Sequence, residues 1–256
     1  MKALIGYTGF IGAHILTQAT FDDLYNSKNI ESIRGKKYDL IVSAGTSSLR
    51  WKANLEPKKD LDEIKKLTSC LRDVRANHFM LISTVDVYPM PNEVDEDSPI
   101  DVKKGNSYGK NRYYLEKFVE KHFKNFTFVR IPQTFGKGIK KNFVFDLIYN
   151  NALDFTHKDS LFQWYNLQNI WKDIVIARKH NISIINFAVE PISAKELAFH
   201  ALGMNFSTIT KQPPLHYDVR TKYGSIYGSD DQYVYHKKKV LDEVKNFILS
   251  EKKQIQ

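Results

Sequence analysis

Cysteine is nearly absent from this chain of 256 residues, which contains Cys70 and no other. A single cysteine excludes a disulfide within the chain. It falls in an apolar-periodic stretch, so we expect a buried bystander and not a nucleophile. Long hydrophobic runs are missing too, since no run approaches the roughly 20 apolar residues that span a membrane. We therefore expect a cytoplasmic protein with no membrane partner.

A concentrated patch of basic charge is also missing. The net charge is +9, from 38 lysines and arginines against 29 acidic residues. A nucleic-acid binder would gather this charge on one face or tail, but the lysines are spread, with the densest runs at 136–141 and 236–239. We expect no nucleic-acid partner. The basic residues form a solvated surface, or some of them attract an anionic small molecule such as a phosphorylated substrate.

Short apolar runs that alternate with helical patterns dominate the first half of the chain. Strands are predicted at residues 2–7, 38–44, 79–84 and 126–131, and helices at 10–19, 61–74 and around 113–119. The second half predicts a helix at 169–180, a strand at 182–189 and helices at 193–202 and 237–249. Nearly continuous apolar strands between helices indicate a parallel sheet covered on both faces. The expected fold class is therefore α/β.

A glycine-rich turn joins the first predicted strand to the first helix, with the spacing G-x-x-G-x-x-G. Glycine lets the backbone turn tightly and approach a pyrophosphate closely, and the helix N-terminus offers free N–H groups. The alternative is a tight turn without a ligand. Because the motif follows the first strand, we favour a dinucleotide site. The predicted contacts are Gly6, Thr8, Gly9, Phe10, Ile11 and Gly12.

The stretch after a second strand, predicted at 23–26, decides which dinucleotide fits. In many dinucleotide sites an acidic residue here holds the ribose 2′-OH of NAD. This chain has Asn26, Ser27 and Lys28 instead. Amide, hydroxyl and ammonium groups suit a 2′-phosphate better, so we expect these residues to contact NADP, with NAD possible. Two alternatives stay open: the stretch is a solvated loop, or Glu31 takes the acidic role.

Six segments in order resemble the extended short-chain dehydrogenase/reductase family, which contains nucleotide-sugar epimerases, dehydratases and reductases. They are GYTGFIG, IVSAGTS, ISTVDVYP, SYGKNRYYLE, VRIPQTFGKG and NFAVEPISAKELA, which begin at residues 6, 41, 82, 107, 129 and 186. The resemblance implies a Rossmann-type doubly wound parallel sheet in residues 1–190, with an excursion into the substrate lobe around 135–165. Residues 191–256 are expected to form a small C-terminal substrate lobe and the terminal helix.

The resemblance implies roles for three residues at the reacting centre. Tyr108 matches the family's general acid/base, which exchanges a proton with the substrate oxygen while the nicotinamide exchanges hydride. Thr84 matches the Ser or Thr that hydrogen-bonds this oxygen. Arg112 stands where the family has a lysine that binds the nicotinamide ribose and lowers the tyrosine pKa. Further cofactor contacts are implied for Ser43, Ala44, Gly45, Ser83 and Pro132.

Arginine at position 112 is the main departure from this pattern. A free tyrosine has a pKa near ~10, and a fixed cation beside it lowers that value. Residues four apart share a helix face, so Arg112 can supply the charge beside Tyr108. Arginine keeps the charge but cannot lose a proton usefully. Two alternatives exist: Lys110, which would point away, and the pair Tyr113 and Lys117, which would require a register shift.

The substrate side offers weaker signals. The Asp-Glu pair that the family's dehydratases carry after the active-site threonine is replaced by Val85 and Asp86, which argues against a dehydratase. An aromatic wall is predicted at Trp164 and Tyr165, and a diphosphate partner at Arg220. For each residue, packing or surface charge is the alternative. The predicted substrate contacts are Asp86, Gln133, Trp164 and Arg220.

Together the motifs predict an NAD(P)-dependent enzyme that acts on a nucleotide-activated sugar, as a reductase or an epimerase. The short chain and its compressed region between the first and third strands look more like the family's reductases. The rival hypothesis is a catalytically weakened protein that binds the dinucleotide and serves as a sensor or partner subunit. We expect no metal site, and a homodimer is possible.

Overall fold

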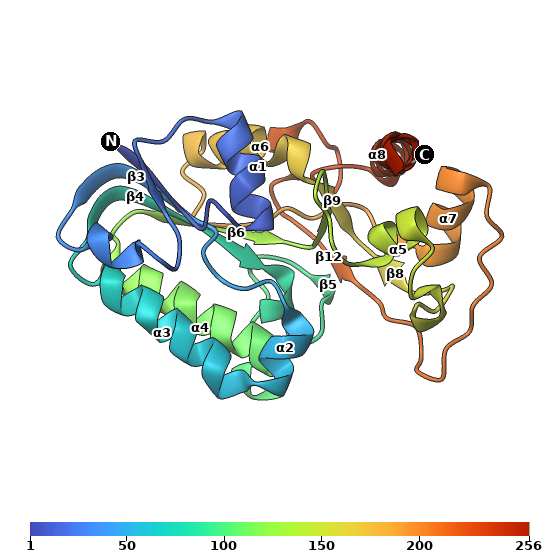
Figure 1. The fold of residues 1–256 in the computed structure, drawn as a ribbon, viewed down its shortest axis with the longest axis horizontal. Coiled ribbons are helices and arrows are strands. Elements are labelled where there is room, and N and C mark those ends of the chain that lie inside the picture. The colour runs from blue at the N-terminus through green and yellow to red at the C-terminus, as the bar shows by residue number, and fades with distance from the viewer. Residues whose placement is uncertain (256) are drawn as a thin grey trace. The chain divides into compact units, whose positions relative to one another are not determined.

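A six-stranded sheet, in the order β10-β6-β4-β3-β1-β2, organises the chain (Figure 1). The structure is a computed structural model and describes residues 1–255. β1 pairs in parallel with both β2 and β3, and β3 pairs in parallel with β4. This is the parallel, Rossmann-type α/β sheet that the sequence predicts. The strands span Lys2–Ile5 (β1), Asp23–Tyr25 (β2), Lys37–Ser43 (β3), Arg75–Thr84 (β4), Phe126–Ile131 (β6) and Ile184–Asn186 (β10).

Helices cover both faces of this sheet, as Figure 1 shows. One face carries α1 (Phe10–Gln18) and α6 (Ile170–Lys179), and the other carries α2 (Arg50–Leu55), α3 (Pro57–Leu71) and α4 (Ser107–His122). Buried residues recur on α3 at helical spacing and give it one apolar face. Cys70 lies on this face and is buried, as expected. The first half also contains three short 3₁₀ helices, η1 (Ile30–Ile33), η2 (Val85–Val87) and η3 (Val102–Lys104).

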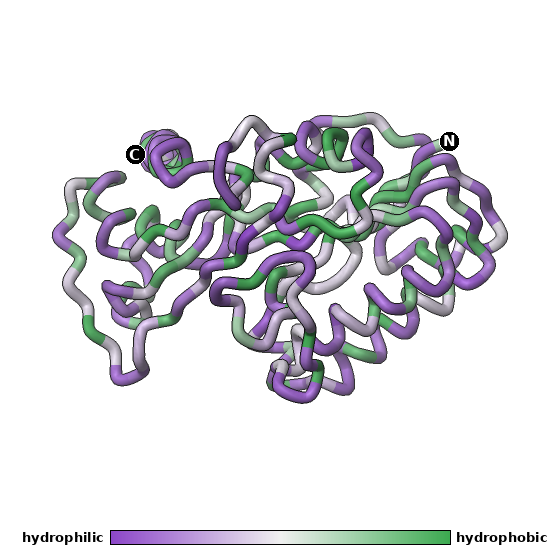
Figure 2. Tube along the Cα trace, turned by 180° about the vertical axis from the view of Figure 1, so that it is seen from behind, coloured by the Kyte–Doolittle hydropathy of each residue, from purple (hydrophilic) through white to green (hydrophobic). Residues whose placement is uncertain are grey.

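Apolar side chains of the strands fill the core between these helices. The central strands are mainly green in the hydropathy colouring of Figure 2, and Ala3, Ile41 and Phe79 have no exposed surface. The ring of Phe79 stacks on Phe123 with 4.4 Å between centroids. Since helices cover both faces, both sides of each central strand must be apolar. The nearly continuous apolar runs of the sequence follow from this arrangement.

The chain divides into two compact units. The first comprises Met1–Met90, Ser98–Arg130 and Ile170–Ile185, and the second comprises Pro91–Asp97, Ile131–Asn169 and the chain from Asn186 onward. The helices of the second unit are α5 (Phe143–Tyr149), α7 (Ala194–Leu202), α8 (Lys237–Ile255), η4 (Leu153–Phe155), η5 (Leu167–Asn169) and η6 (Gly224–Tyr227). Its short strands are β5 (Asn92–Val94), β7 (Gln133–Phe135), β8 (Leu161–Phe162), β9 (Trp164–Asn166), β11 (Ile192–Ser193) and β12 (Asp218–Val219).

The later elements confirm some sequence predictions and correct others. The helix predicted at 193–202 is confirmed as α7, and Ser193 caps it, because its Oγ accepts the N–H of Glu196 at 3.2 Å. The predicted strand at 182–189 is shortened to β10, although Phe187 and the two residues after it are fully buried. A run of apolar residues indicates that a segment is buried, but a buried segment does not have to pair as a strand. The terminal helix continues to Ile255, beyond its predicted end at 249.

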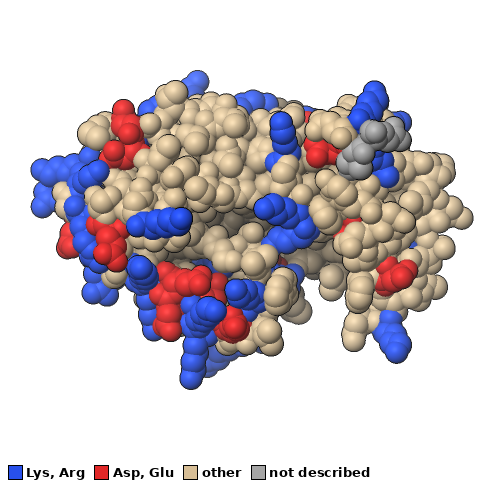
Figure 3. All heavy atoms as spheres, in the orientation of Figure 1, with Lys and Arg blue, Asp and Glu red and all other residues tan. Residues whose placement is uncertain are grey.

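Basic and acidic side chains are interspersed on the face of the molecule that Figure 3 shows. Ion pairs join exposed basic and acidic side chains, as in Lys117 and Glu120 at 2.8 Å. Within residues 1–255, every helix is too short or too polar to cross a membrane. The same residues contain no cluster of three histidine, cysteine or acidic side chains that could hold a metal ion.

Candidate active site

The order of the strands creates a switch point between β1 and β3. From β1 the sheet grows outward to β2 on one side and to β3, β4, β6 and β10 on the other. In open α/β sheets, ligands bind beyond the carboxyl ends of the strands at such a point. Three predicted site segments follow adjacent strands here: the glycine turn after β1, Ser43 to Gly45 at β3, and Thr84 at the end of β4.

The fold requires glycine at two of the three glycine positions of the turn, but not at the third. Gly6 has a φ of +85°, and a Cβ there would lie 2.4 Å from the carbonyl oxygen of Ala44. A Cβ on Gly12 would lie 2.0 Å from the carbonyl oxygen of Gly6. These two positions therefore require glycine for the fold itself. Gly9 is exposed, its φ of −80° is ordinary, and a Cβ there would meet only that same oxygen, at 3.2 Å.

The turn fits the pyrophosphate of a dinucleotide. Gly9 stands at the N-cap of α1, so the N–H groups of Phe10, Ile11 and Gly12 have no partner one turn earlier in the helix. Thr8 and Gly9 are exposed beside them. The hydroxyl of Ser43, at the end of β3, is buried and has no hydrogen-bond partner among the described residues. Free donors beside a surface without side chains suit an anionic ligand.

Gly9 therefore offers a test that separates ligand binding from folding. We expect Gly9→Ala to weaken NADPH binding at least about tenfold, because a methyl group would occupy the space that a pyrophosphate approaches, while the melting temperature changes little. Gly12→Ala, the matched variant on the same turn, should instead lower the melting temperature, because its methyl group meets a backbone carbonyl. Fluorescence titration and calorimetry measure the two effects. Unaltered NADPH affinity in Gly9→Ala would contradict this assignment.

The loop after β2 is held by its own amide side chains. Asn26 Oδ1 accepts the N–H of Lys28 at 2.9 Å, and Asn26 Nδ2 donates to the hydroxyl of Tyr7 in the glycine turn at 3.2 Å. The loop is thus anchored to the turn, while Ser27 and Lys28 are exposed. The alternative acidic residue, Glu31, is largely exposed and faces Lys66 at 3.8 Å. The loop presents hydroxyl and ammonium groups and no carboxylate.

The first turn of α4 brings Tyr108 to Thr84. A Cβ on Gly109 would lie 2.0 Å from the carbonyl oxygen of Asp86, so glycine permits the helix to pack directly against η2. Asn106 caps the helix by accepting the N–H of Gly109 at 2.9 Å. Tyr108 is buried, and its hydroxyl is hydrogen-bonded to Thr84. The two predicted reacting residues, from α4 and from the end of β4, are therefore in contact.

The surroundings of Tyr108 keep its phenol protonated. Burial is the largest influence and raises the pKa of Tyr108. Arg112 lowers this pKa, Asp86 raises it, and the hydrogen bond with Thr84 lowers it, in decreasing order of effect. The net shift is upward from the usual value near ~10. Tyr108 is therefore a neutral phenol at physiological pH, and a neutral phenol can donate a proton.

Arg112 is turned toward Asp60 of α3. Its guanidinium forms an ion pair with that carboxylate at 2.7 Å and also donates to the carbonyl oxygen of Ser47 at 2.5 Å. The two alternatives to Arg112 lie elsewhere. Lys117 Nζ lies 5.2 Å from the ring centre of Tyr113 and bonds to Glu120 on the exposed face. Lys110 Nζ instead donates to a backbone carbonyl, that of Lys103, at 3.1 Å.

A second buried ion pair fixes the remainder of α4. Arg130 of β6 donates to both carboxylate oxygens of Glu116, at 3.0 and 2.7 Å, and to the hydroxyl of Tyr88 at 2.8 Å. The hydroxyl of Ser83, expected to contact the cofactor, donates to Glu116 at 2.6 Å. All four side chains are buried. This network locks α4 to β4 and β6 and so sets the position of Tyr108 on the sheet.

Comparison with known proteins identifies the fold of the chain but not a sequence family. No protein-family model matches the chain, and no curated protein matches its sequence. Among solved structures, RMD from Pseudomonas aeruginosa complexed with NADPH has a TM-score of 0.76 at 14% identity and covers 100% of both chains. The chain has the fold of these enzymes. MoeE5 in complex with UDP-glucose and NAD (TM-score 0.73, 13% identity) covers 100% of this chain and 99% of its own.

A third match is dTDP-4-dehydrorhamnose reductase from Yersinia enterocolitica, with a TM-score of 0.70 and 17% identity, covering 97% of this chain and 99% of the reductase. The matched structures are nucleotide-sugar enzymes of the extended short-chain dehydrogenase/reductase family. The resemblance inferred from the motifs is thus confirmed at the level of the fold.

The predicted substrate residues are already engaged. Trp164, predicted as part of an aromatic wall with packing as the alternative, is fully buried, with its ring centroid 5.4 Å from that of Phe162. Arg220 Nη2 lies 2.8 Å from carboxylate oxygens of both Asp218 and Glu93. These contacts occupy the guanidinium that a diphosphate would need. In the first unit, Asp86 pairs with Arg50 of α2 at 3.3 Å.

Three other predicted residues lie in the second unit. Gln133 is half-buried in β7 and pairs in register with Trp164 of β9. Pro132 precedes it and is buried. The fully buried Tyr165, on β9, stacks on Phe187 with 5.2 Å between centroids. Tyr165 and Pro132 are therefore part of the buried interior of the second unit, whereas Gln133 is only half-buried.

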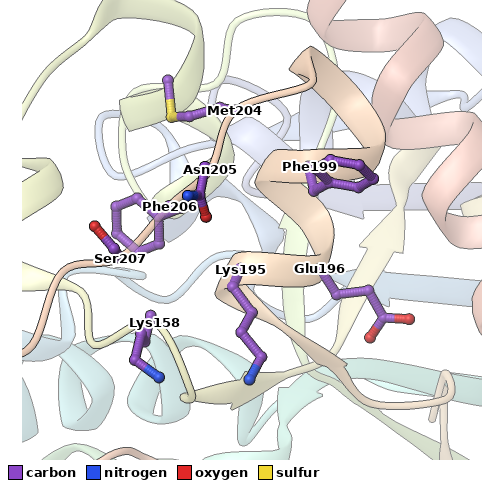
Figure 4. A pocket seen from close by; sticks show the side chains of 8 residues that line it. All are labelled: Lys158, Lys195, Glu196, Phe199, Met204, Asn205, Phe206 and Ser207. Carbon is purple, nitrogen blue, oxygen red and sulfur yellow. The ribbon is translucent and has the colours of Figure 1, made fainter.

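The second unit contains an open hollow of about 490 Å³ beside α7 (Figure 4). Lys158 and Lys195 point to the same side of it in Figure 4. Both ammonium groups lie 2.8 Å from the carboxylate of Asp159. Both ammonium groups therefore already pair with one carboxylate, and neither is without a partner in the hollow.

Proposed function

We propose that this chain is an NADP-dependent oxidoreductase that acts on a nucleotide-activated sugar, with Tyr108 as its general acid/base. The contact between Tyr108 and Thr84 carries the proposal. It lies at the end of β4, beside the strands whose carboxyl ends hold the glycine turn and Ser43. The names of the matched enzymes, which include UDP-glucose as ligand and a dTDP-sugar reductase, support this substrate class.

Thr84, Tyr108 and the nicotinamide would each have a separate role in the reaction. The nicotinamide, when bound, supplies or accepts the hydride. The Thr84 hydroxyl would orient the oxygen of the reacting carbon, and Tyr108 would give that oxygen a proton. Because burial favours the neutral phenol, proton donation is the step for which Tyr108 is prepared, and donation accompanies the reduction of a carbonyl. We therefore favour a reductase. An epimerase would use the same proton and hydride positions.

The cofactor choice rests on the loop after β2. We expect NADPH at one hundred times its dissociation constant to stabilise the protein by about 2.7 kcal/mol, which raises the melting temperature by roughly 5–10 °C, and NADH to do so less. Lys28→Ala should lose about tenfold in NADPH affinity with little change for NADH, because it removes a partner of the 2′-phosphate. Lys65→Ala, an exposed lysine on α3, is the control. Tighter binding of NADH than of NADPH would refute the choice.

A second candidate function is a dinucleotide-binding protein with weakened catalysis that acts as a sensor or partner subunit. The observation in its favour is the engagement of Arg112 by Asp60, since this guanidinium is not free to bind a ribose and the pKa of Tyr108 stays raised despite its presence. A panel of nucleotide sugars with NADPH separates the two functions. Turnover of any member supports the reductase, whereas NADPH binding without turnover across the panel supports the second candidate.

A further inference from the structure

Asp60 and Arg112 form a buried, two-point ion pair. Nη1 of Arg112 lies 2.7 Å from Oδ2 of Asp60, and Nη2 lies 2.9 Å from Oδ1. Two parallel bonds between a guanidinium and a carboxylate are both strong and directional. Each side chain is less than a tenth exposed. Asn111 Nδ2 also donates to Oδ2 of Asp60, at 2.8 Å. One carboxylate of α3 therefore holds two consecutive side chains of α4.

The guanidinium is fixed against the catalytic candidate. Cζ of Arg112 lies 4.3 Å from the ring centroid of Tyr108, within the range of a cation–π contact. Asp60 stands in the first turn of α3, where the helix dipole favours a carboxylate. A lysine ammonium is a compact point charge without a planar fork, and it cannot form two parallel bonds and also lie flat against a ring. The position of Asp60 thus explains an arginine at position 112.

A third element completes the clamp around the first turn of α4. Oδ1 of Asn54, on α2, accepts the backbone N–H of Tyr108 at 3.0 Å. The carbonyl oxygen of Ser47, just before α2, accepts from Arg112. A hollow of about 230 Å³ between α2 and α3 is bordered by Ser47 and Asp60. Contacts from α2, α3 and the segment between β3 and α2 therefore converge on Tyr108 and Arg112.

We propose that Asp60 is a positioning residue of this site: it fixes the Arg112 guanidinium against the Tyr108 ring and opposes part of its charge, so that Arg112 places Tyr108 and is not free to bind a ribose. The catalytic meaning of this proposal rests on the proposed function, but the ion pair and its effect on Tyr108 do not. This role differs from the one that the sequence resemblance implies for position 112, which is to bind the nicotinamide ribose with a free cation.

The charges that face Tyr108 come from three elements. They are Arg112 on α4, Asp60 on α3 and Asp86 on η2, and Asp86 is itself paired with Arg50 of α2. If only the carboxylate of Asp60 is removed, the guanidinium over the ring is unopposed. An unopposed cation stabilises the phenolate, so the pKa of Tyr108 must fall. If both charges of the pair are removed, the phenolate loses its stabilisation by Arg112, which influences this pKa more than Asp60 does, so the pKa of Tyr108 should rise.

The experiment is a pH titration of Tyr108, read as the difference in tyrosinate absorbance between each protein and the same protein carrying Tyr108→Phe. We expect Asp60→Asn to move the Tyr108 step to lower pH by about one unit or more. Asp62→Asn, which removes an exposed carboxylate of α3, should leave the step in place. A purely structural role of Asp60 would change the melting temperature but not this midpoint. An unmoved midpoint in a folded Asp60→Asn protein overturns the proposal.

A second variant decides the matter if Asp60→Asn does not fold. The double variant Asp60→Asn with Arg112→Gln buries no charge and keeps groups that can hydrogen-bond to each other. Its Tyr108 step should lie at higher pH than in the unmodified protein, because the larger influence of Arg112 is lost together with that of Asp60, and an unmoved or lower step would refute the placement of the guanidinium at the ring. The titration requires neither cofactor nor substrate. Failure of NADPH binding would therefore overturn the proposed function and leave this result standing.

Discussion

Tyr108→Phe is expected to lower turnover of a nucleotide sugar by about 10²–10⁴-fold, the usual contribution of a positioned acid or base. The substitution removes the hydroxyl that contacts Thr84 and keeps the ring that packs against Arg112. NADPH affinity should change by less than about twofold, because the helix and its clamp are retained. Steady-state rates on the productive substrate, together with a fluorescence titration of NADPH, measure both quantities.

Tyr113→Phe is the matched control for that experiment. Tyr113 lies on the same helix, but it faces Lys117 on the exposed side of α4. Its loss should leave turnover unaltered. If Tyr108→Phe retained full turnover, or if Tyr113→Phe abolished it, the assignment of Tyr108 as acid/base would be wrong.

Glu116→Ala should have the largest effect on stability, a loss of about 3–5 kcal/mol, because it leaves the buried guanidinium of Arg130 without its anion. For a chain of this size the loss corresponds to a fall in melting temperature of roughly 6–20 °C. The hydroxyl of Ser83 loses its acceptor in the same variant. Differential scanning calorimetry provides the measurement.

Glu120→Ala tests whether burial is the reason. Glu120 pairs with Lys117 on the same helix, but both side chains are about half exposed. Exposed pairs contribute about 0–1 kcal/mol, so its melting temperature should be nearly that of the unmodified protein. Equal losses from Glu116→Ala and Glu120→Ala would show that the network with Arg130 does not stabilise the first unit.

The parts that could be predicted from the sequence depend on short-range patterns. The glycine turn, the strands before it and at Phe126–Ile131, and the cap at Ser193 each follow from residues within a few positions of one another. The contact between Tyr108 and Thr84 could be predicted because each residue belongs to a segment with a recognisable local motif. The parallel sheet then brings those segments to one edge.

The parts that were missed depend on contacts across long separations. Asp60 and Arg112 are 52 positions apart, and Asn54 reaches Tyr108 across 54. On sequence alone Asp60 is one acidic residue in a run of charges and carries no local signal. For Trp164 the sequence left a substrate wall and packing open for a related reason, because an aromatic residue in a short strand has the same local pattern whether it lines a site or fills a core. Only its complete burial distinguishes the two.

The ion pair of α3 and α4 also changes how related chains should be recognised. A sequence motif that requires lysine four residues after the tyrosine does not match this chain, which has Arg112 there. Exchange of that lysine for arginine without an acid at position 60 would bury an unopposed charge, so we expect the two positions to change together. The informative signature is therefore a pair: an acidic residue in the first turn of one helix, and an arginine one turn after the tyrosine in the next.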